Sequence, residues 1–112
     1  MYTSLEHYID GNWVKPSGDK SQDVMNPATS KPIGTLGHVS RGDLDKALAA
    51  ADKGFKQWRK VPVFERGKVL RKAAELMRAR ADEIAKVLTL EEGKVLMEAK
   101  VEVQSGADIV DW

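Results

Sequence analysis

The stretch Ser40-Arg41-Gly42-Asp43-Leu44 marks the point at which the sequence changes to a helical period. Ser40 and Asp43 fit a capping box, in which a serine before the helix and an acidic residue three positions later cap the first turn. Apolar residues then recur at steps of three and four, typical of one face of a helix, at Leu44, Ala47, Leu48, Ala51, Phe55 and Trp58. The pattern therefore predicts a helix that ends before Pro62.

Three more helices are expected after this first one. Pro62 opens the second, whose apolar face is expected at Val69, Ala73, Leu76 and Met77, widened by Leu70 and Ala74. The third begins near Ala81 and ends at Gly93, because glycine readily adopts the left-handed conformation that follows many helices. The fourth runs from about Leu96 to the end of the chain.

Short β-type runs and turn residues fill positions 1–39. Asp10-Gly11 favours a tight type I′ hairpin turn, since both central residues need positive φ. Asn26-Pro27 ends a short strand because proline has no N–H to donate, and residues 33–39 alternate as a half-exposed strand does. The prediction is an antiparallel β meander over 1–39 followed by about four helices over 40–112. Such a meander is marginal by itself and should lie against other structure.

Composition and charge exclude several classes of protein. The 112 residues suffice for one small domain, and the 42% hydrophobic and 31% charged residues are typical of a globular chain. Eighteen basic and seventeen acidic residues give a net charge of +1, which argues against a general polyanion binder. No cysteine is present, which excludes disulfides, thiolate zinc sites and a cysteine nucleophile within these residues. The first residues lack a secretory pattern, and no apolar run could span a bilayer, so a cytoplasmic chain without membrane or nucleic-acid partners is expected.

The charges are nevertheless unevenly distributed along the helical part. Residues 59–80 carry eight basic and two acidic side chains, whereas residues 81–112 carry three basic and eight acidic ones. One interpretation is a basic helix face that binds nucleic acid or another acidic partner. The other is a pair of neighbouring helices whose opposite charges attract, and this is favoured because no aromatic residues or known motif support nucleic-acid binding.

Catalytic patterns are not found in the sequence. His7 and His38 lack a second metal ligand at helical or hairpin spacing, and Gly34 and Gly37 lack the spacing of a phosphate-binding loop. No catalytic or cofactor-binding residue is therefore predicted.

Two further sets of residues carry weak functional signals. Glu98 and Glu102 lie four apart on one helix face, a pairing that could serve acid–base chemistry but more commonly marks a solvated face or salt-bridge partners. The tryptophans are expected to anchor a core or an interface rather than to stack on a ligand; they are Trp13, Trp58 and Trp112.

The order of several short motifs resembles the beginning of an aldehyde dehydrogenase. The first of them are Tyr8-Ile9-Asp10-Gly11-Asn12-Trp13-Val14, Asn26-Pro27-Ala28-Thr29, Ile33-Gly34, Ala51 and Phe55-Lys56-Gln57-Trp58. The match continues through Glu65-Arg66, Leu70, Arg80-Ala81-Asp82-Glu83-Ile84-Ala85, Leu88-Thr89, Glu91-Glu92-Gly93-Lys94, Glu98-Ala99, Glu102-Val103 and Ala107-Asp108-Ile109-Val110-Asp111-Trp112. The residues in these motifs are most similar to those of the succinate-semialdehyde dehydrogenase branch.

This resemblance implies an α/β fold and an oxidoreductase. The segment matches the opening part of a Rossmann-type NAD(P)-binding domain, and the family oxidises an aldehyde, here succinate semialdehyde, to its acid with NAD or NADP. The family attacks the aldehyde with a cysteine thiolate and stabilises the oxyanion. Its cysteine, its general-base glutamate and its cofactor-phosphate segments lie downstream of the matched region. The chain by itself is therefore expected to lack the catalytic domain, to be inactive and to bind no cofactor.

A few residue roles follow from the same resemblance. Ser105, Ile109 and Trp112 fall on or near positions that line the substrate entry tunnel in the family. For Trp112, ordinary packing against other residues is an equally open interpretation. Val24 and Met25, through main-chain oxygens, and Glu91 match positions that hold a structural monovalent cation in many relatives. Hard cations prefer oxygen ligands, and a further ligand would come from outside this segment.

The expected partner is the rest of an aldehyde dehydrogenase chain. Residues 108–112 show no glycine stop and place two acidic groups where they oppose the helix dipole, so Trp112 is not expected to be the natural terminus. Apolar faces over 44–58 and 97–110 would then lack partners, which predicts self-association or a homo-oligomer. The alternative is a free-standing helical interaction module that binds an acidic partner through the basic face from Arg66 to Arg80.

Overall fold

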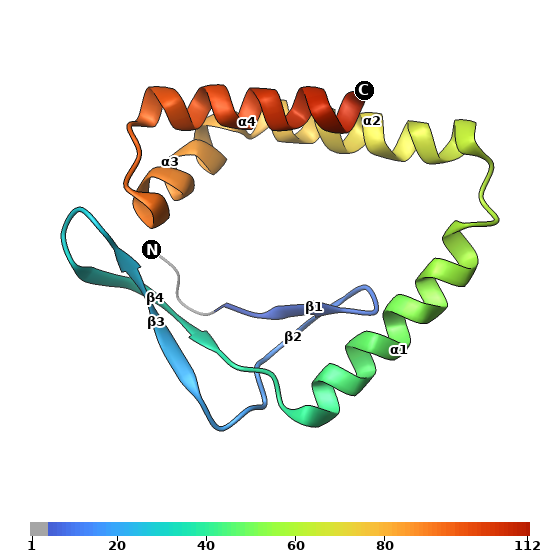
Figure 1. Ribbon diagram of the computed structural model, residues 1–112, viewed down its shortest axis with the longest axis horizontal. Helices are drawn as coiled ribbons and strands as arrows, with labels where there is room; N and C mark the ends of the chain where they lie inside the picture. The colour runs from blue at the N-terminus through green and yellow to red at the C-terminus, as the bar shows by residue number, and fades with distance from the viewer. Residues whose placement is uncertain (1–4) are drawn as a thin grey trace. The chain divides into compact units, whose positions relative to one another are not determined.

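The computed structural model describes residues 5–112, and strands precede helices throughout this range (Figure 1). The elements are β1 (His7–Ile9), β2 (Asn12–Val14), β3 (Ser21–Asn26), β4 (Lys31–Gly37), α1 (Arg41–Trp58), α2 (Val63–Ala79), α3 (Ala81–Glu92) and α4 (Leu96–Asp111). The mixed α/β class and the four predicted helices are confirmed. Residues 1–4 of the predicted meander lie outside the described residues.

The described strands form two separate two-stranded sheets instead of one continuous meander. In the first, β1 pairs with β2 antiparallel, with His7 opposite Val14. Asp10 and Gly11 between them have φ values of 49° and 83°, as the predicted type I′ turn requires. In the second, β3 pairs with β4. The ladder does not continue from β2 to β3 because residues 15–20 intervene and Pro16 has no N–H to donate.

The chain forms two compact units whose limits differ from the change of period at Ser40. The first unit comprises the residues up to Met25 together with Ser30–Lys60, so α1 belongs with the strands. The second comprises Asn26–Thr29, the end of β3 and the loop after it, together with Val61–Trp112, and so contains α2, α3 and α4.

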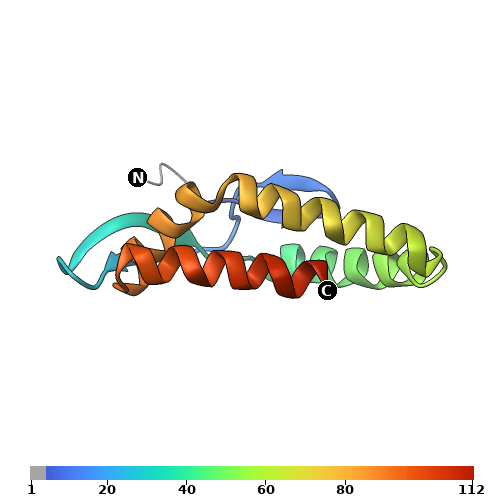
Figure 2. The same ribbon diagram turned by 90° about the horizontal axis from the view of Figure 1, so that it is seen from above.

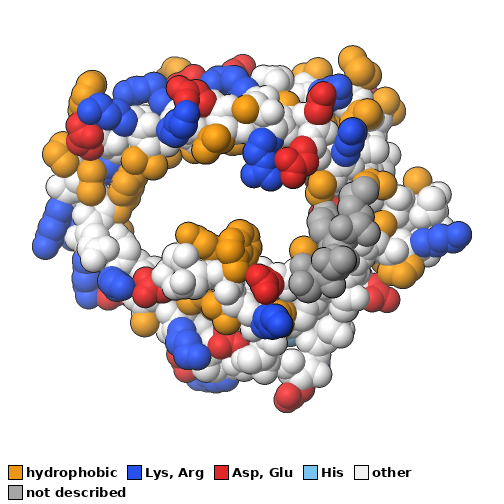
Figure 3. Space-filling view, turned by 180° about the vertical axis from the view of Figure 1, so that it is seen from behind, with side chains coloured by type: hydrophobic (Ala, Val, Ile, Leu, Met, Phe, Trp, Pro, Cys, Tyr) orange, Lys and Arg blue, Asp and Glu red, His pale blue; other side chains and the backbone are white. Residues whose placement is uncertain are grey.

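In the first unit the start of α1 shows the Ser40 half of the predicted capping box, while the carboxylate of Asp43 accepts a hydrogen bond from Ser17. The Ser40 hydroxyl accepts a hydrogen bond from the backbone N–H of Asp43 at 3.1 Å. The apolar face expected along this helix is nevertheless exposed, with Phe55 at 62% and Leu48 at 61%. Figure 3 shows hydrophobic side chains at the surface of the molecule. The spacing correctly grouped these residues on one face, but the described residues provide no layer that covers it.

In the second unit α4 packs along α2 (Figure 2) and against α3. The three helices share a core of small residues. The buried residues are Ala74, Ala81, Ala85, Ala99, Val103 and Ala107. Because alanine has only a methyl group, the helices can approach closely. The larger residues expected to form the apolar face of α2 are mostly outside this core; Val69 is 56% exposed.

The tryptophans do not anchor a core in the described residues. Trp13 is exposed and packs against Tyr8 on the neighbouring strand, with ring centroids 5.1 Å apart. Trp58 is 40% exposed, and Trp112 is completely exposed. None of the three rings is buried within the described residues, so their expected role as anchors of a core or an interface stays a prediction.

Opposite charges join the basic and acidic helices, which supports the interpretation that neighbouring helices attract. Arg78 of α2 in the basic segment pairs with Asp108 and Asp111 of α4 in the acidic segment. Within the acidic segment, Lys100 of α4 pairs with Asp82 of α3 at 2.7 Å. Two other basic residues of residues 59–80 pair within α2, Lys68 with Glu65 and Lys72 with Glu75. Arg80, which lies between α2 and α3, pairs with Glu83 of α3. Within the described residues, no helix is long and apolar enough to cross a membrane.

Candidate functional site

The outer face of α4 carries the three residues predicted to line a substrate tunnel. Ser105 and Ile109 are spaced by four residues and lie on one side of the helix, and Trp112, the C-cap residue after Asp111, continues that spacing by three. The residues that pack against α2 and α3 lie on the opposite side and are Ala99, Val103 and Ala107. Ile109 is 76% exposed, and Ser105 and Trp112 are exposed as well. The structure thus brings the three candidates to one open face, and their role in a tunnel stays a prediction.

The last turn of α4 is held by a residue that the sequence reasoning did not single out. The Nη2 atom of Arg78 lies 2.8 Å from Oδ1 of Asp108, and both Nη1 and Nη2 lie 3.1 Å from Oδ2 of Asp111. The hydrogen bond with Asp108, supported by that with Asp111, raises the pKa of Arg78 above its ordinary value. The three residues lie on two helices, α2 and α4, and a signal for them existed in the uneven distribution of charge.

The residues proposed for a cation site are divided between the two units. Val24 and Met25 lie in β3 within the first unit, and Glu91 lies in the last turn of α3 within the second. The loop after β3 does reach the end of α3, because a β-carbon added to Gly93 would lie 2.8 Å from Cγ of Pro27. Within residues 5–112, no three His, Cys, Asp or Glu side chains gather as a metal site would require. The cation site stays a prediction.

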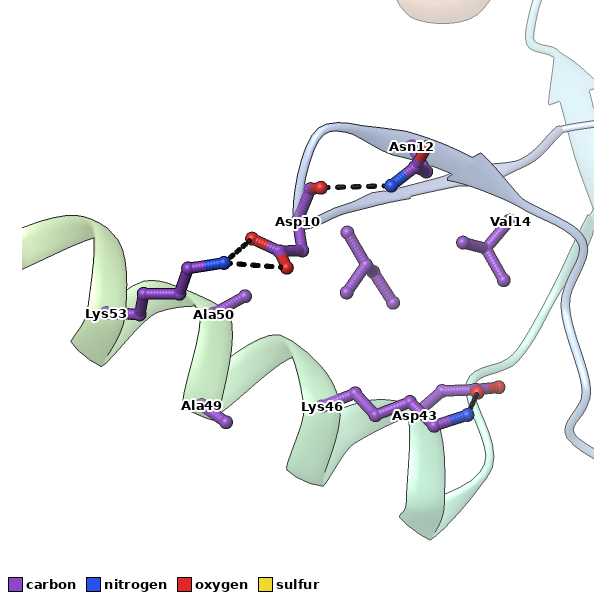
Figure 4. Close-up of a pocket in the computed structure, with 9 residues that line it drawn as sticks. Asp10, Asn12, Val14, Asp43, Lys46, Ala49, Ala50 and Lys53 are labelled. Carbon is purple, nitrogen blue, oxygen red and sulfur yellow. Dashed lines mark hydrogen bonds and ion pairs between the residues drawn. The ribbon is translucent and has the colours of Figure 1, made fainter.

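A pocket of about 400 Å³ lies between the β1–β2 hairpin and α1 in the first unit (Figure 4). Its apolar lining includes Ile9 and Val14 from the hairpin and Ala49 and Ala50 from α1. Its two lysines are already paired, Lys53 with Asp10 at 3.2 Å and Lys46 with Asp43 at 3.5 Å. The sequence reasoning did not predict this pocket, although Lys46 and Lys53 lie two helical turns apart on one face of α1.

Comparison with known proteins decides the family. The model of the aldehyde dehydrogenase family matches residues 13–112. The chain belongs to the aldehyde dehydrogenase family. It is 40% identical over 109 residues to malonate-semialdehyde dehydrogenase 3 of Geobacillus kaustophilus (strain HTA426), covering 97% of this chain and 22% of that relative.

Solved aldehyde dehydrogenases share the fold of this segment. Lactaldehyde dehydrogenase from Escherichia coli superposes with a TM-score of 0.91 at 38% identity, over 96% of this chain and 23% of the other. A point mutant of betaine aldehyde dehydrogenase from Staphylococcus aureus, solved with NAD+, gives 0.88 at 27% identity, over 96% and 22%. The aldehyde-dehydrogenase-like fold is therefore confirmed. The chain spans about a fifth of the length of these relatives.

The start of α1 in this aldehyde dehydrogenase segment does not fit the phosphates of a dinucleotide. Such phosphates bind at a helix N-terminus that follows a glycine-rich turn. At the N-terminus of α1 the buried carboxylate of Asp43 already accepts a hydrogen bond from Ser17, and its negative charge opposes a phosphate. Gly37 lies within β4 against the ring of Pro16, with no positive φ. No cofactor contact is therefore assigned to these residues.

Of the paired carboxylates of α4, Glu102 forms a salt bridge and Glu98 lies exposed. Glu102 accepts a hydrogen bond from Lys94, which also pairs with Glu92 at 3.0 Å. Glu98 is exposed, as is Glu102. Acid–base catalysis by a carboxylate pair depends on removing one group from water, and this helix face does not do so.

Proposed function

We propose that this chain is the N-terminal part of an NAD(P)-dependent aldehyde dehydrogenase that oxidises an aldehyde to its carboxylic acid. The observation that carries the proposal is the family match over residues 13–112. The likeness to a dehydrogenase solved with NAD+ supports a nicotinamide cofactor. Because the chain spans about a fifth of its relatives, the cofactor and the reacting groups are expected on other residues of a longer protein.

The proposed substrate is a short semialdehyde that carries a carboxylate. The sequence resemblance favours succinate semialdehyde, whereas the relative described above is named for malonate semialdehyde. The two compounds differ by one methylene group, and a hydrophobic site distinguishes such a difference by only about 1–3 kcal/mol. Both compounds are therefore to be tested.

The proposed contribution of this segment is structural. The exposed face of α4 with Ser105, Ile109 and Trp112 is expected to form one wall of the substrate path. Main-chain oxygens of Val24 and Met25, with Glu91, are expected to supply part of a monovalent cation site. The rest of the dehydrogenase chain is the expected partner, and a homo-oligomer and a cytoplasmic location stay predictions.

A direct assay tests the proposal. The protein made from the native gene is purified, its intact mass is measured, and it is assayed beside the 112-residue chain with both semialdehydes and with NAD+ and NADP+. We expect the 112-residue chain to give no cofactor reduction above the blank, because it holds no cysteine. A native product several times heavier than 12.4 kDa should reduce the cofactor.

Two results of this assay would contradict the proposed function. Turnover by the 112-residue chain would show that the chemistry does not need residues outside it. A native product without aldehyde oxidation would remove the enzymatic proposal, and salt-dependent binding of that product to a polyanion such as heparin would then favour the interaction module.

A further inference from the structure

We propose that Arg78 is a positioning residue of the substrate path: it holds the last turn of α4 and thereby the exposed face that carries Ile109 and Trp112. This inference rests on the proposed function, since it assigns that face to the aldehyde. Arg78 itself lies on α2 and is not expected to touch substrate.

The last turn of α4 is unfavourable without an outside cation. The final carbonyl groups of a helix lack partners within it and give its end a partial negative charge. Asp108 and Asp111 add two full negative charges in this turn, and α4 has no basic residue there. A positive charge from another element is therefore needed to hold the turn in place.

Arg78 supplies that positive charge, and the geometry of its guanidinium group also fixes the position of the turn. Its two terminal nitrogens reach Asp108 at 2.8 Å and Asp111 at 3.1 Å, so one planar guanidinium group joins two residues one turn apart. A lysine carries the same charge but cannot bond two carboxylates with a rigid fork. Beside it, Met77 of α2 lies 3.5 Å from where a β-carbon on Gly106 would be. Adjacent residues of α2 thus hold one stretch of α4.

The two carboxylates that Arg78 holds alternate with the predicted tunnel residues. Asp108 precedes Ile109, and Asp111 precedes Trp112. Since a helical turn moves as a unit, release of both aspartates would also release the two exposed side chains. The side chain of Arg78 is about one-third exposed, so the pairing is partly protected from solvent.

Hydrogen exchange on the 112-residue chain tests whether Arg78 holds the turn. Arg78→Met keeps the length of the side chain and removes its charge, and Arg80→Met is the matched control because Arg80 pairs with Glu83 and not with α4. We expect about ten-fold faster exchange for the amides of residues 108–112 in Arg78→Met. Equal exchange in Arg78→Met and Arg80→Met would overturn the inference. Arg78→Lys, which keeps the charge, should fall between the wild type and Arg78→Met, and it is measured in case Arg78→Met does not fold.

Kinetics of the native-gene product test whether the turn positions substrate. We expect Arg78→Met to raise the KM for the aldehyde about five-fold, with kcat and the KM for NAD(P) within about two-fold of the wild type. The double variant Asp108→Asn, Asp111→Asn should reproduce this effect, and Arg78→Lys should restore part of it. An unchanged KM for the aldehyde, or an equal loss in all kinetic constants, would overturn the positioning role. A wild type without aldehyde oxidation would refute the proposed function and the role of Arg78 in the substrate path together. The hydrogen-exchange result would still show whether Arg78 holds the last turn of α4.

Discussion

The hydroxyl group of Ser17 donates a hydrogen bond to the carboxylate of Asp43, which joins the loop after β2 to the first turn of α1. Asp43 is 5% exposed and is the buried acidic residue of the described chain. The bond from Ser17 is the main cause of a lowered pKa, and bonds from Ser40 and Lys46 contribute. The carboxylate is therefore held in its charged form at a point where loop and helix meet.

The first prediction concerns the pH dependence of stability. A carboxyl group with a lowered pKa in the folded state stabilises the fold above its ordinary value of 3.8, and this stabilisation is lost as the pH falls below that value. Asp43→Asn should therefore lower the free energy of unfolding at neutral pH, and the difference from wild type should shrink near pH 3. Urea unfolding at several pH values measures it, with Asp45→Asn as control. A constant difference across the range would contradict this account.

The second prediction concerns Gly93, which ends α3 with a φ of 79°. Gly93→Ala should destabilise the second unit by more than about 1 kcal/mol, because alanine is strained at positive φ and its β-carbon would meet Pro27. Gly54→Ala is the control: Gly54 lies within α1 with open space around it, so alanine there should be neutral or stabilising by about 0.5–1 kcal/mol. Thermal unfolding followed by circular dichroism compares the two. Equal stability of both variants would show that the contact with Pro27 is unimportant.

The third prediction concerns the alanine core. Ala99 is fully buried between α4 and its neighbours, so Ala99→Leu should cost about 1–3 kcal/mol through overpacking. Ala51→Leu on the exposed side of α1 makes the same chemical change without a neighbour to displace and should leave stability nearly unchanged. Denaturant unfolding of both variants measures the difference. A stability loss of the same size in Ala51→Leu would indicate that the core is not where the structure places it.

The fourth prediction concerns the exposed apolar side chains. Leu48 and Phe55 lie on one face of α1 and are both more than half exposed, so the isolated 112-residue chain should associate as its concentration rises. Phe55→Glu should reduce this association, whereas Lys56→Glu, one residue further along the helix, should not. Light scattering over a concentration series makes the measurement. A wild-type chain that stays monomeric at high concentration would contradict the expectation.

Local signals made the elements predictable from the sequence. Asp10-Gly11 has the positive φ values that its turn needs, Ser40 caps α1, and Gly93 ends α3, because each depends on residues close in the sequence. The core was not predictable in the same way. Periodicity identifies an apolar face, but it does not say whether a neighbour covers that face, and here small residues such as Ala99 are covered instead of large ones such as Phe55.

The candidate site was predictable only in part. The spacing of Ser105, Ile109 and Trp112 places them on one side of α4, which the structure shows. The contact of Arg78 with Asp108 was not predictable, since a charge imbalance between two segments does not identify which atoms meet. The proposed roles of these residues in a substrate path stay predictions.

The division of the chain into two units determines where the backbone can be cleaved, or the gene divided, without disrupting either unit. Asn26–Thr29, which is the end of β3 and the loop after it, clusters with the last three helices, although the rest of β3 and all of β4 belong to the first unit. Neither unit is therefore an uninterrupted stretch of sequence, and no single break in the backbone divides one from the other intact. A gene fusion that copied residues 61–112 would leave behind the proline against which Gly93 packs.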